Sequence, residues 1–194
     1  QVNDITFDGV SLTPLVERNP ISAPDPIDDT FNHIWFINAA DFTGGVFPNS
    51  ALDVTLDAAS RGNVTVLALS GTAGVGTTVI GSRDSSSVSL TPTAGSLVLL
   101  SYGMGGDGNT ANLGEVTSPA GTTEVARQEN GSNWDGHVVA YENGVASGST
   151  SYTFTDTGST VGGHVIAAEF LAIPEPSTLG FLGFAFLGLM RRRR

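Results

Sequence analysis

Short segments rich in β-branched and aromatic residues make up most of this 194-residue chain, and clusters of Gly, Ser, Asn, Asp and Pro separate them. In several segments the apolar residues alternate, so that Leu52, Val54 and Leu56 share one face of an extended chain, as do Tyr152 and Phe154. Before the last twenty-odd residues, no segment of ten residues shows a helical period. Such a chain can bury its apolar side chains only by pairing strands into sheets.

Many strands at short spacing without helices predict an all-β fold. We expect an antiparallel β-sandwich with jelly-roll-like connectivity over residues 1–172, followed by a short C-terminal hydrophobic helix. The predicted strands cover residues 4–7, 13–17, 33–38, 50–57, 64–70, 86–90, 96–104, 122–128, 137–142, 151–156 and 164–172.

A faint internal repeat suggests that this body consists of two pseudo-equivalent halves. Residues 53–69 and 152–168 both read as a strand, a polar turn and an apolar strand, and Val66 aligns with Val165. If the repeat holds, the earlier half lacks one strand before Gln1 and leaves a sheet edge open. We expect that edge to pair with another subunit, giving a homo-oligomer or polymer. The alternatives are chance similarity and a chain that is a fragment.

The composition excludes several classes of function. With no cysteine there is no disulfide framework, thiol nucleophile or thiolate zinc site. Eight basic residues, all arginine, stand against nineteen acidic ones, and four of the arginines end the chain. The acidic body repels a phosphate backbone, so we expect no nucleic-acid partner.

Residues 173–194 differ from the body. Pro174, Glu175 and Pro176 form a stiff stretch, because proline fixes φ and lacks a backbone donor. We expect a helix over residues 177–190, apolar from Leu179 onward, that enters the membrane. At 1.5 Å per residue it is about 21 Å long, shorter than the ~30 Å hydrocarbon core. Four arginines then act as a membrane stop on the cytoplasmic side: Arg191, Arg192, Arg193 and Arg194.

This order of Pro-Glu-Pro, short glycine-bearing apolar helix and arginine cluster resembles the PEP-CTERM sorting signal of exported bacterial proteins. The resemblance implies an exosortase, a membrane-embedded cysteine transpeptidase-like protease, that cuts near Pro174-Glu175-Pro176. It also implies a Gram-negative-type envelope and association with exopolysaccharide or a biofilm matrix. The chain starts at Gln1 without methionine, so we expect a leader already removed or a fragment. The alternative for the tail is a segment packed in the core.

Two loops carry clustered oxygen ligands, which suit a hard cation. The first, rich in proline, holds Asp25, Asp28 and Asp29. The second, rich in glycine, holds four candidate calcium ligands: Asp107, Asn109, Asn112 and Glu115. Neither loop has the EF-hand spacing, so solvated acids are the alternative, and calcium is the one candidate cofactor.

Trp134 lies in a polar turn between Asn133 and Asp135, where an exposed aromatic ring can stack on a sugar. It is the candidate carbohydrate contact; the alternative is a tryptophan folded back onto the body. Trp35 lies in the apolar run 33–37 and is expected in the core. The three histidines, His33, His137 and His164, have no metal-ligand spacing, and no G-x-S-x-G motif occurs. We therefore assign no catalytic residue.

Together these features predict an exported, non-enzymatic structural protein of the cell envelope or extracellular matrix. One alternative is a lectin-like module that binds carbohydrate through Trp134. A further alternative is a secreted hydrolase with an unrecognised pair of carboxylates.

Overall fold

The protein is built from antiparallel strands. A computed structural model describes residues 2–18, 32–38, 51–56, 64–82, 85–105, 116–130, 135–156 and 163–173. These ranges contain no helix, and every pair of strands in them is antiparallel. The all-β antiparallel class is therefore confirmed. The sandwich with jelly-roll connectivity stays a prediction, and the helix predicted over residues 177–190 lies outside the described residues.

Fourteen strands form five sheets among the described residues. In chain order they are β1 (Val2–Phe7), β2 (Val10–Ser11), β3 (Thr13–Arg18), β4 (Asn32–Phe36), β5 (Leu52–Leu56), β6 (Thr72–Ile80), β7 (Ser87–Leu90), β8 (Leu97–Gly105), β9 (Val116–Thr117), β10 (Thr123–Asn130), β11 (Asp135–Asn143), β12 (Thr150–Thr153), β13 (Thr155–Asp156) and β14 (Gly163–Ala172). The largest sheet has the order β10-β11-β8-β14-β6, and we call it the central sheet.

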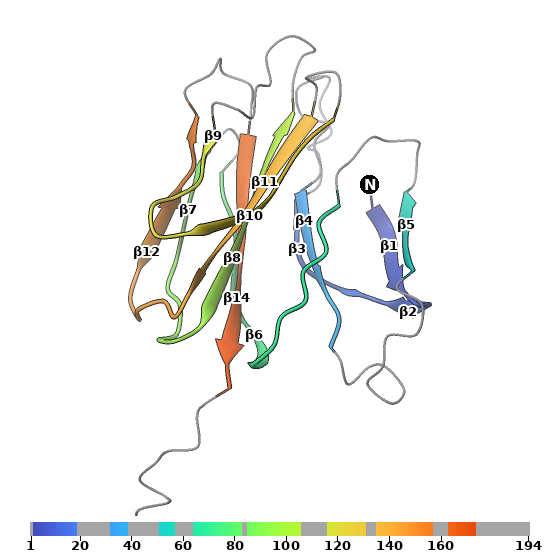
Figure 1. The fold of residues 1–194 in the computed structure, drawn as a ribbon, viewed down its shortest axis with the longest axis horizontal. Helices are drawn as coiled ribbons and strands as arrows, with labels where there is room; N and C mark the ends of the chain where they lie inside the picture. The colour runs from blue at the N-terminus through green and yellow to red at the C-terminus, as the bar shows by residue number, and fades with distance from the viewer. Residues whose placement is uncertain are drawn as a thin grey trace, which may run out of the picture.

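The central sheet has other strands on both of its faces. Figure 1 shows β7, β9 and β12 on one side and the β3–β4 pair on the other, with β1, β2 and β5 beyond that pair. The contacts agree, since buried side chains of the central sheet belong to two separate apolar clusters. The chain therefore stacks its strands in layers around one sheet.

The first core lies between the central sheet and the β7–β12 and β9–β13 pairs. Alternate residues of β8, Val98, Leu100 and Tyr102, point into it and are almost fully buried. The rings of Tyr102 and Phe154 stack with centroids 5.1 Å apart and planes 14° apart, a favourable aromatic contact. This core attaches the covering strands to the central sheet.

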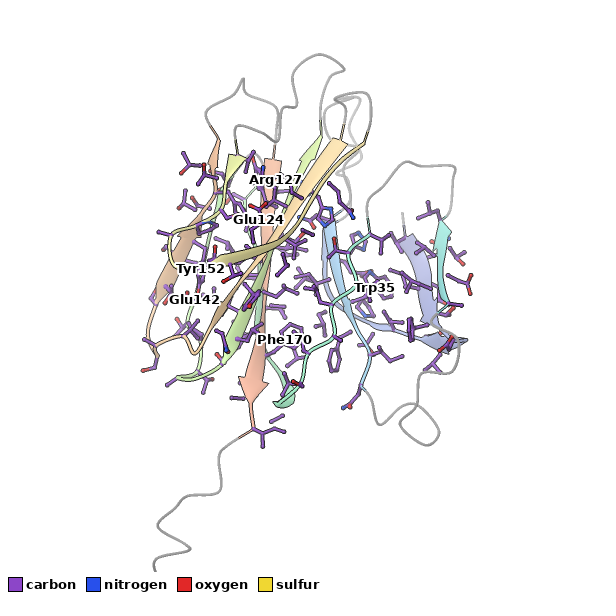
Figure 2. All side chains as sticks on the ribbon, in the orientation of Figure 1. Trp35, Glu124, Arg127, Glu142, Tyr152 and Phe170 are labelled. Atoms are coloured by element: carbon purple, nitrogen blue, oxygen red, sulfur yellow. The ribbon has the colours of Figure 1, made fainter. Side chains whose placement is uncertain are left out.

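The second core lies on the opposite face, beneath the β3–β4 pair. Val16 and Ile34 from that pair meet Leu99, Val139 and Ile166 of the central sheet. Phe36 lies against Phe170 with ring centroids 5.8 Å apart (Phe170 is labelled in Figure 2). Without the β3–β4 pair, the central sheet would expose the large apolar side chains on this face.

Strand β14 lies between β8 and β6 and contributes to both cores. Val165 and Ala167 point into the first core, whereas Ile166, Ala168 and Phe170 point into the second. This explains why residues 163–172 read as a nearly continuous apolar run rather than an alternating one.

One predicted strand is wrong. Residues 64–70 form a short, largely apolar run in the sequence, but the structure places them in no ladder. Their proposed equivalent in the repeat becomes the central β14, so the two segments do not play the same structural role. Exposure still varies along the segment, because Thr65 and Leu69 are half-buried while Val64, Val66 and Leu67 are exposed.

Strand β6 is not among the strands predicted from the sequence. Gly74 has a φ of 149°, and a Cβ at Gly76 would overlap the carboxylate of Glu169. Glycine in a strand lowers its β propensity, yet it permits a close approach of this kind. Register shifts in the β6–β14 pairing, one of them between Ala168 and Phe170, mark the place where Glu169 fits.

Glu169 is a buried carboxylate that connects three elements. Its side chain accepts hydrogen bonds from the backbone N–H of Thr77 in β6, at 2.8 Å, and of Thr93 after β7, at 2.6 Å. Burial opposes ionisation, but these bonds, with further ones from Ser96 and Thr93, outweigh it and lower the pKa of Glu169. Glu169 therefore stays charged and holds the edge strand β6 against the sheet.

Replacing Glu169 by Gln should lower the free energy of unfolding by about 2–3 kcal/mol at neutral pH, since the amide presents a donor where two N–H groups need acceptors. The Glu169 contribution is present above the unfolded pKa near 4.5 and is lost as pH falls through the lowered folded pKa. Urea unfolding against pH measures both effects. Glu124→Gln, on the surface, is the control and should cost no more than about 1 kcal/mol. Equal losses for both variants would contradict this role.

Candidate functional site

Every site residue predicted from the sequence lies outside the described residues. This applies to the candidate carbohydrate contact Trp134, to Pro174, Glu175 and Pro176, and to the terminal arginines. It applies also to the candidate calcium ligands Asp107, Asn109, Asn112 and Glu115, and to Asp25, Asp28 and Asp29. The structure does describe the strand ends from which these segments depart.

Those strand ends lie together at one end of the central sheet, which we call the loop end. Gly105, the last residue before 106–115, pairs with Asp135, the first residue after Trp134. Gly163, which follows 157–162, pairs with Met104. The calcium and carbohydrate candidates, far apart in sequence, are therefore attached to neighbouring residues of one sheet.

The segment with the other acidic cluster starts from the same place. Residues 19–31 connect β3 to β4 and are flanked by the cross-strand partners Arg18 and Asn32. The amide nitrogen of Asn32 donates to the carbonyl of Ser101 at 3.0 Å and to that of His164 at 3.2 Å. Asn32 thus connects the start of β4 to two strands of the central sheet.

Asn32 is the centre of a buried polar cluster at the loop end. It is only 6% exposed, and its amide oxygen accepts a hydrogen bond from the Ser101 hydroxyl at 2.7 Å. It lies over Gly103, where a Cβ would come within 3.2 Å of its amide nitrogen. A side chain at position 103 would displace the amide, so Gly103 permits this contact.

Two histidines flank Gly103 in the central sheet. His137 on β11 and His164 on β14 both pair with Gly103, so the three residues form one row facing the β3–β4 pair. The ring Nε2 of His137 lies 3.2 Å from the hydroxyl of Thr65. Its buried Nδ1 has no hydrogen-bond partner in the part of the chain that the structure describes. Burial lowers the pKa of His137, which favours the neutral ring.

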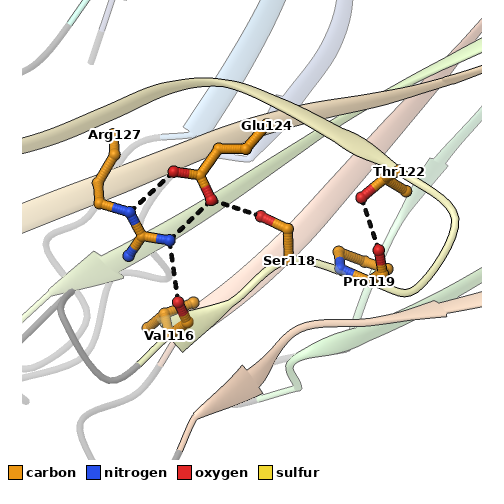
Figure 3. Close-up of polar contacts among 6 residues, drawn as sticks. All are labelled: Val116, Ser118, Pro119, Thr122, Glu124 and Arg127. Atoms are coloured by element: carbon orange, nitrogen blue, oxygen red, sulfur yellow. Dashed lines mark hydrogen bonds and ion pairs between the residues drawn. The ribbon is translucent and has the colours of Figure 1, made fainter.

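A second polar cluster surrounds the start of β9, the strand that follows residues 106–115 (Figure 3). The Arg127 guanidinium forms two hydrogen bonds to the Glu124 carboxylate, at 2.8 and 2.7 Å, and Ser118 donates to the same carboxylate at 2.7 Å. Arg127 also donates to the carbonyl of Val116, the first residue of β9, at 2.9 Å. The Arg127 hydrogen bond is the main reason that the pKa of Glu124 is lowered. The strand that leaves the glycine-rich segment is therefore tied to β10.

Other polar side chains have structural partners. Tyr152 donates to Glu142 at 2.7 Å, and burial together with this carboxylate raises the pKa of Tyr152; Figure 2 labels the pair. The expectation that Trp35 lies in the core is not confirmed: its side chain is half-buried, alternates with Ile34 and Phe36 along β4, and belongs to neither of the two described cores. Its ring stacks on that of His33 with centroids 6.3 Å apart. Nδ1 of His33 lies 3.6 Å from a carboxylate oxygen of Glu17.

Neither a metal cluster nor a membrane-spanning helix is found where the structure describes the chain. Within those ranges no three His, Asp or Glu side chains gather in a way that could hold a metal ion. The same ranges hold no helix with the length and apolarity needed to cross a bilayer.

The Asn32–Ser101 contact was not predicted from the sequence, although the sequence carries a signal for it. Asn32, Ile34 and Phe36 alternate along β4, so Asn32 belongs to the face that Ile34 and Phe36 bury. A buried amide needs partners, and Ser101 on the facing strand supplies one.

Comparison with known proteins identifies the tail. Residues 172–194 match the PEP-CTERM protein-sorting motif, which confirms the resemblance drawn from Pro174-Glu175-Pro176, the apolar segment and the arginines. No curated protein and no solved structure matches the chain. The motif implies export and sorting by an exosortase, and a place in the bacterial cell envelope.

Acidification should destabilise the body through His137. Its folded pKa lies below the unfolded value of 6.5, so the stability gained from a neutral ring is complete above about pH 6.5 and is lost as pH falls through the lowered folded pKa. His137→Gln should flatten the pH dependence of the unfolding free energy below about pH 6.5. Glu124→Gln, measured in the same way, should keep the wild-type slope there. A wild-type slope in His137→Gln would contradict this assignment.

Proposed function

We propose that this protein is an exported structural component of the cell envelope or extracellular matrix, sorted and processed through its tail by an exosortase. The observation that carries the proposal is the PEP-CTERM motif over residues 172–194. The motif starts at Ala172, the last residue of β14. Sorting signal and folded body therefore meet at the end of a strand.

This junction suits a cut that leaves the body whole. Ile173 donates its N–H to the carbonyl of Gly71 at 2.9 Å. The Pro174-Glu175-Pro176 stretch follows directly, so an exosortase that cuts there leaves β14 and its pairing with β6 and β8 on the body side of the cut. The body can be released into the envelope or the matrix only if its fold does not depend on the tail that is cut off.

A structural rather than enzymatic role agrees with how the described acidic groups are used. Glu169 accepts backbone N–H groups, Glu142 accepts the Tyr152 hydroxyl and Glu124 binds Arg127. Each of these carboxylates connects two strands or a strand and a loop. The proposal makes the acidic surface the means of contact with exopolysaccharide, through bridging cations, and includes association of copies by strand pairing.

The tail can be tested in the native host by replacing the four terminal arginines. Because the positive charge stops transfer across the membrane, changing all four to Gln should abolish retention and leave little processed protein. Changing all four to Lys keeps the charge and should preserve processing, which makes it the matched control. Immunoblots of envelope and medium fractions, with mass determination of the C-terminus, measure both. Normal processing of the Gln variant would contradict the proposal.

A second candidate function, binding of carbohydrate, is favoured by the geometry of the loop end. Gly105 and Asp135 are cross-strand partners, so the segment with Asp107 and the turn with Trp134 depart from adjacent positions. Loops grouped at one end of a rigid sheet are a common location for ligand sites. In this second candidate function, Trp134 stacks on a sugar. Calcium holds the glycine-rich segment through its four candidate ligands, Asp107, Asn109, Asn112 and Glu115.

Carbohydrate binding can be tested on a glycan array with and without calcium. Trp134→Ala should reduce binding at least about tenfold, the loss expected when a stacking contact of about 1.4 kcal/mol disappears. Trp134→Phe keeps an aromatic face and should retain most of the binding. No binding by the wild-type protein, or equal binding by all three, would exclude this second function.

A further inference from the structure

Residues 64–70, which we call the unpaired segment, have side chains that favour a strand but take part in no ladder. The segment VTVLALS contains no charge, no proline and no glycine. It runs as thin coil into β6 in Figure 1 and belongs to no strand.

The inner side of the unpaired segment is fastened to the body. Leu69 packs against the second core, and the hydroxyl of Thr65 lies 3.2 Å from the ring nitrogen of His137. The side-chain amide of Gln128 in β10 donates to the carbonyl of Val64 at 3.4 Å. These contacts hold the segment in place against the second core.

The outer side is apolar and open to solvent. Val66 is 64% exposed and Val64 is 50% exposed, and Ala68 is exposed on the same side. No backbone N–H of residues 64–70 donates to a carbonyl within the described ranges. Unmet backbone groups beside exposed valines are the pattern by which one strand adds to another.

Three other edge strands of the described structure, β10, β6 and β3, carry features that discourage such pairing. The edge strand β10 contains Glu124 and Arg127 and is interrupted by a bulge, and the edge strand β6 has two register shifts. Strand β3 contains Pro14 and Glu17 and a further irregularity. Charges, prolines and bulges are the usual means of protecting an edge, and residues 64–70 have none of the three.

We propose that residues 64–70 pair antiparallel with the same segment of a second copy of this chain. This deepens the proposed structural role, on which it rests, by locating the strand pairing. Centred on Leu67, the pairing sets Val66 opposite Ala68 and Thr65 opposite Leu69 of the other copy. Outward residues then meet outward residues, as an antiparallel pair requires. The contact is self-complementary and closes as a two-fold dimer.

Charge favours a second copy at this position over the charged edge strands β3 and β10. The chain has a formal charge of −11, so two copies repel over most of their surfaces. An uncharged segment brings no like charges face to face. Added salt screens the remaining repulsion, so association should strengthen with ionic strength, whereas bridging by cations alone would not depend on residues 64–70.

The absence of cysteine makes a direct test possible in the full chain. In the proposed register the two copies of Leu67 lie opposite each other, with Cα atoms about 4.5–5.5 Å apart, within disulfide range. The two copies of Val64 lie about 20 Å apart, six residues out of register. Leu67→Cys should therefore form a covalent dimer under mild oxidation at least about tenfold faster than Val64→Cys. Val125→Cys, 39% exposed on β10, is the control for random collision.

A second variant tests the contact without cysteine. Val66→Lys places a charge on the outer side, and because Val66 is largely exposed its thermal unfolding should match the wild type. It should weaken dimerisation in sedimentation equilibrium at least about tenfold, whereas Val125→Lys should not. Crosslinking of Leu67→Cys no faster than that of Val125→Cys, or equal rates for Leu67→Cys and Val64→Cys, would overturn the proposal. Exosortase processing of the C-terminus is measured in a separate experiment. Failure of the crosslinking or the dimerisation experiment would therefore leave the proposed sorting role untouched.

Discussion

Burial of the central sheet on both faces is the constraint on which the rest of the structure depends. A sheet that is covered on one side can alternate apolar and polar residues, but β8, β11 and β14 supply apolar side chains to two cores. Two further layers are then required, and strands β7, β9 and β12 form one while β3 and β4 form the other. Polar groups trapped between layers need partners, which is why Asn32 and Glu169 are bonded to the backbone of neighbouring strands.

The same constraint shows how far the sequence could predict the fold. Ten of the eleven segments expected to be strands contain strand residues in the structure, because alternation and turn residues are local signals. Residues 64–70 are also rich in strand-forming residues but form no ladder, since a local sequence signal supplies no partner strand. Strand β6 could not be predicted because Gly74 and Gly76 lower its local β propensity. The strand needs Gly76 to make room for Glu169, and this contact joins residues that are far apart in the sequence.

The candidate sites show a similar division. The tail could be identified from the sequence because its information is linear, and the family match at residues 172–194 confirms it. The proximity of the segments that hold Asp107 and Trp134 could not be predicted, since it depends on the pairing of Gly105 with Asp135. The Asn32–Ser101 contact joins residues that are distant along the chain, and only the register of β4 over β8 brings them together. The sorting signal can thus be identified from a short stretch of sequence, whereas a binding site at the loop end depends on how the strands pair.

Strand β14 lies inside the central sheet and directly precedes Pro174-Glu175-Pro176 of the sorting motif, so we expect the body to keep its fold without residues 174–194. Native-state hydrogen exchange of the full chain and of a chain ending at Ile173 tests it most directly. The backbone amides of Ile166, Ala167 and Ala168 should be among the slowest to exchange in both, at rates set by global unfolding and equal within error. Faster exchange of these amides after removal of the tail, by an order of magnitude or more, would show that residues 174–194 are part of the fold and would contradict the account.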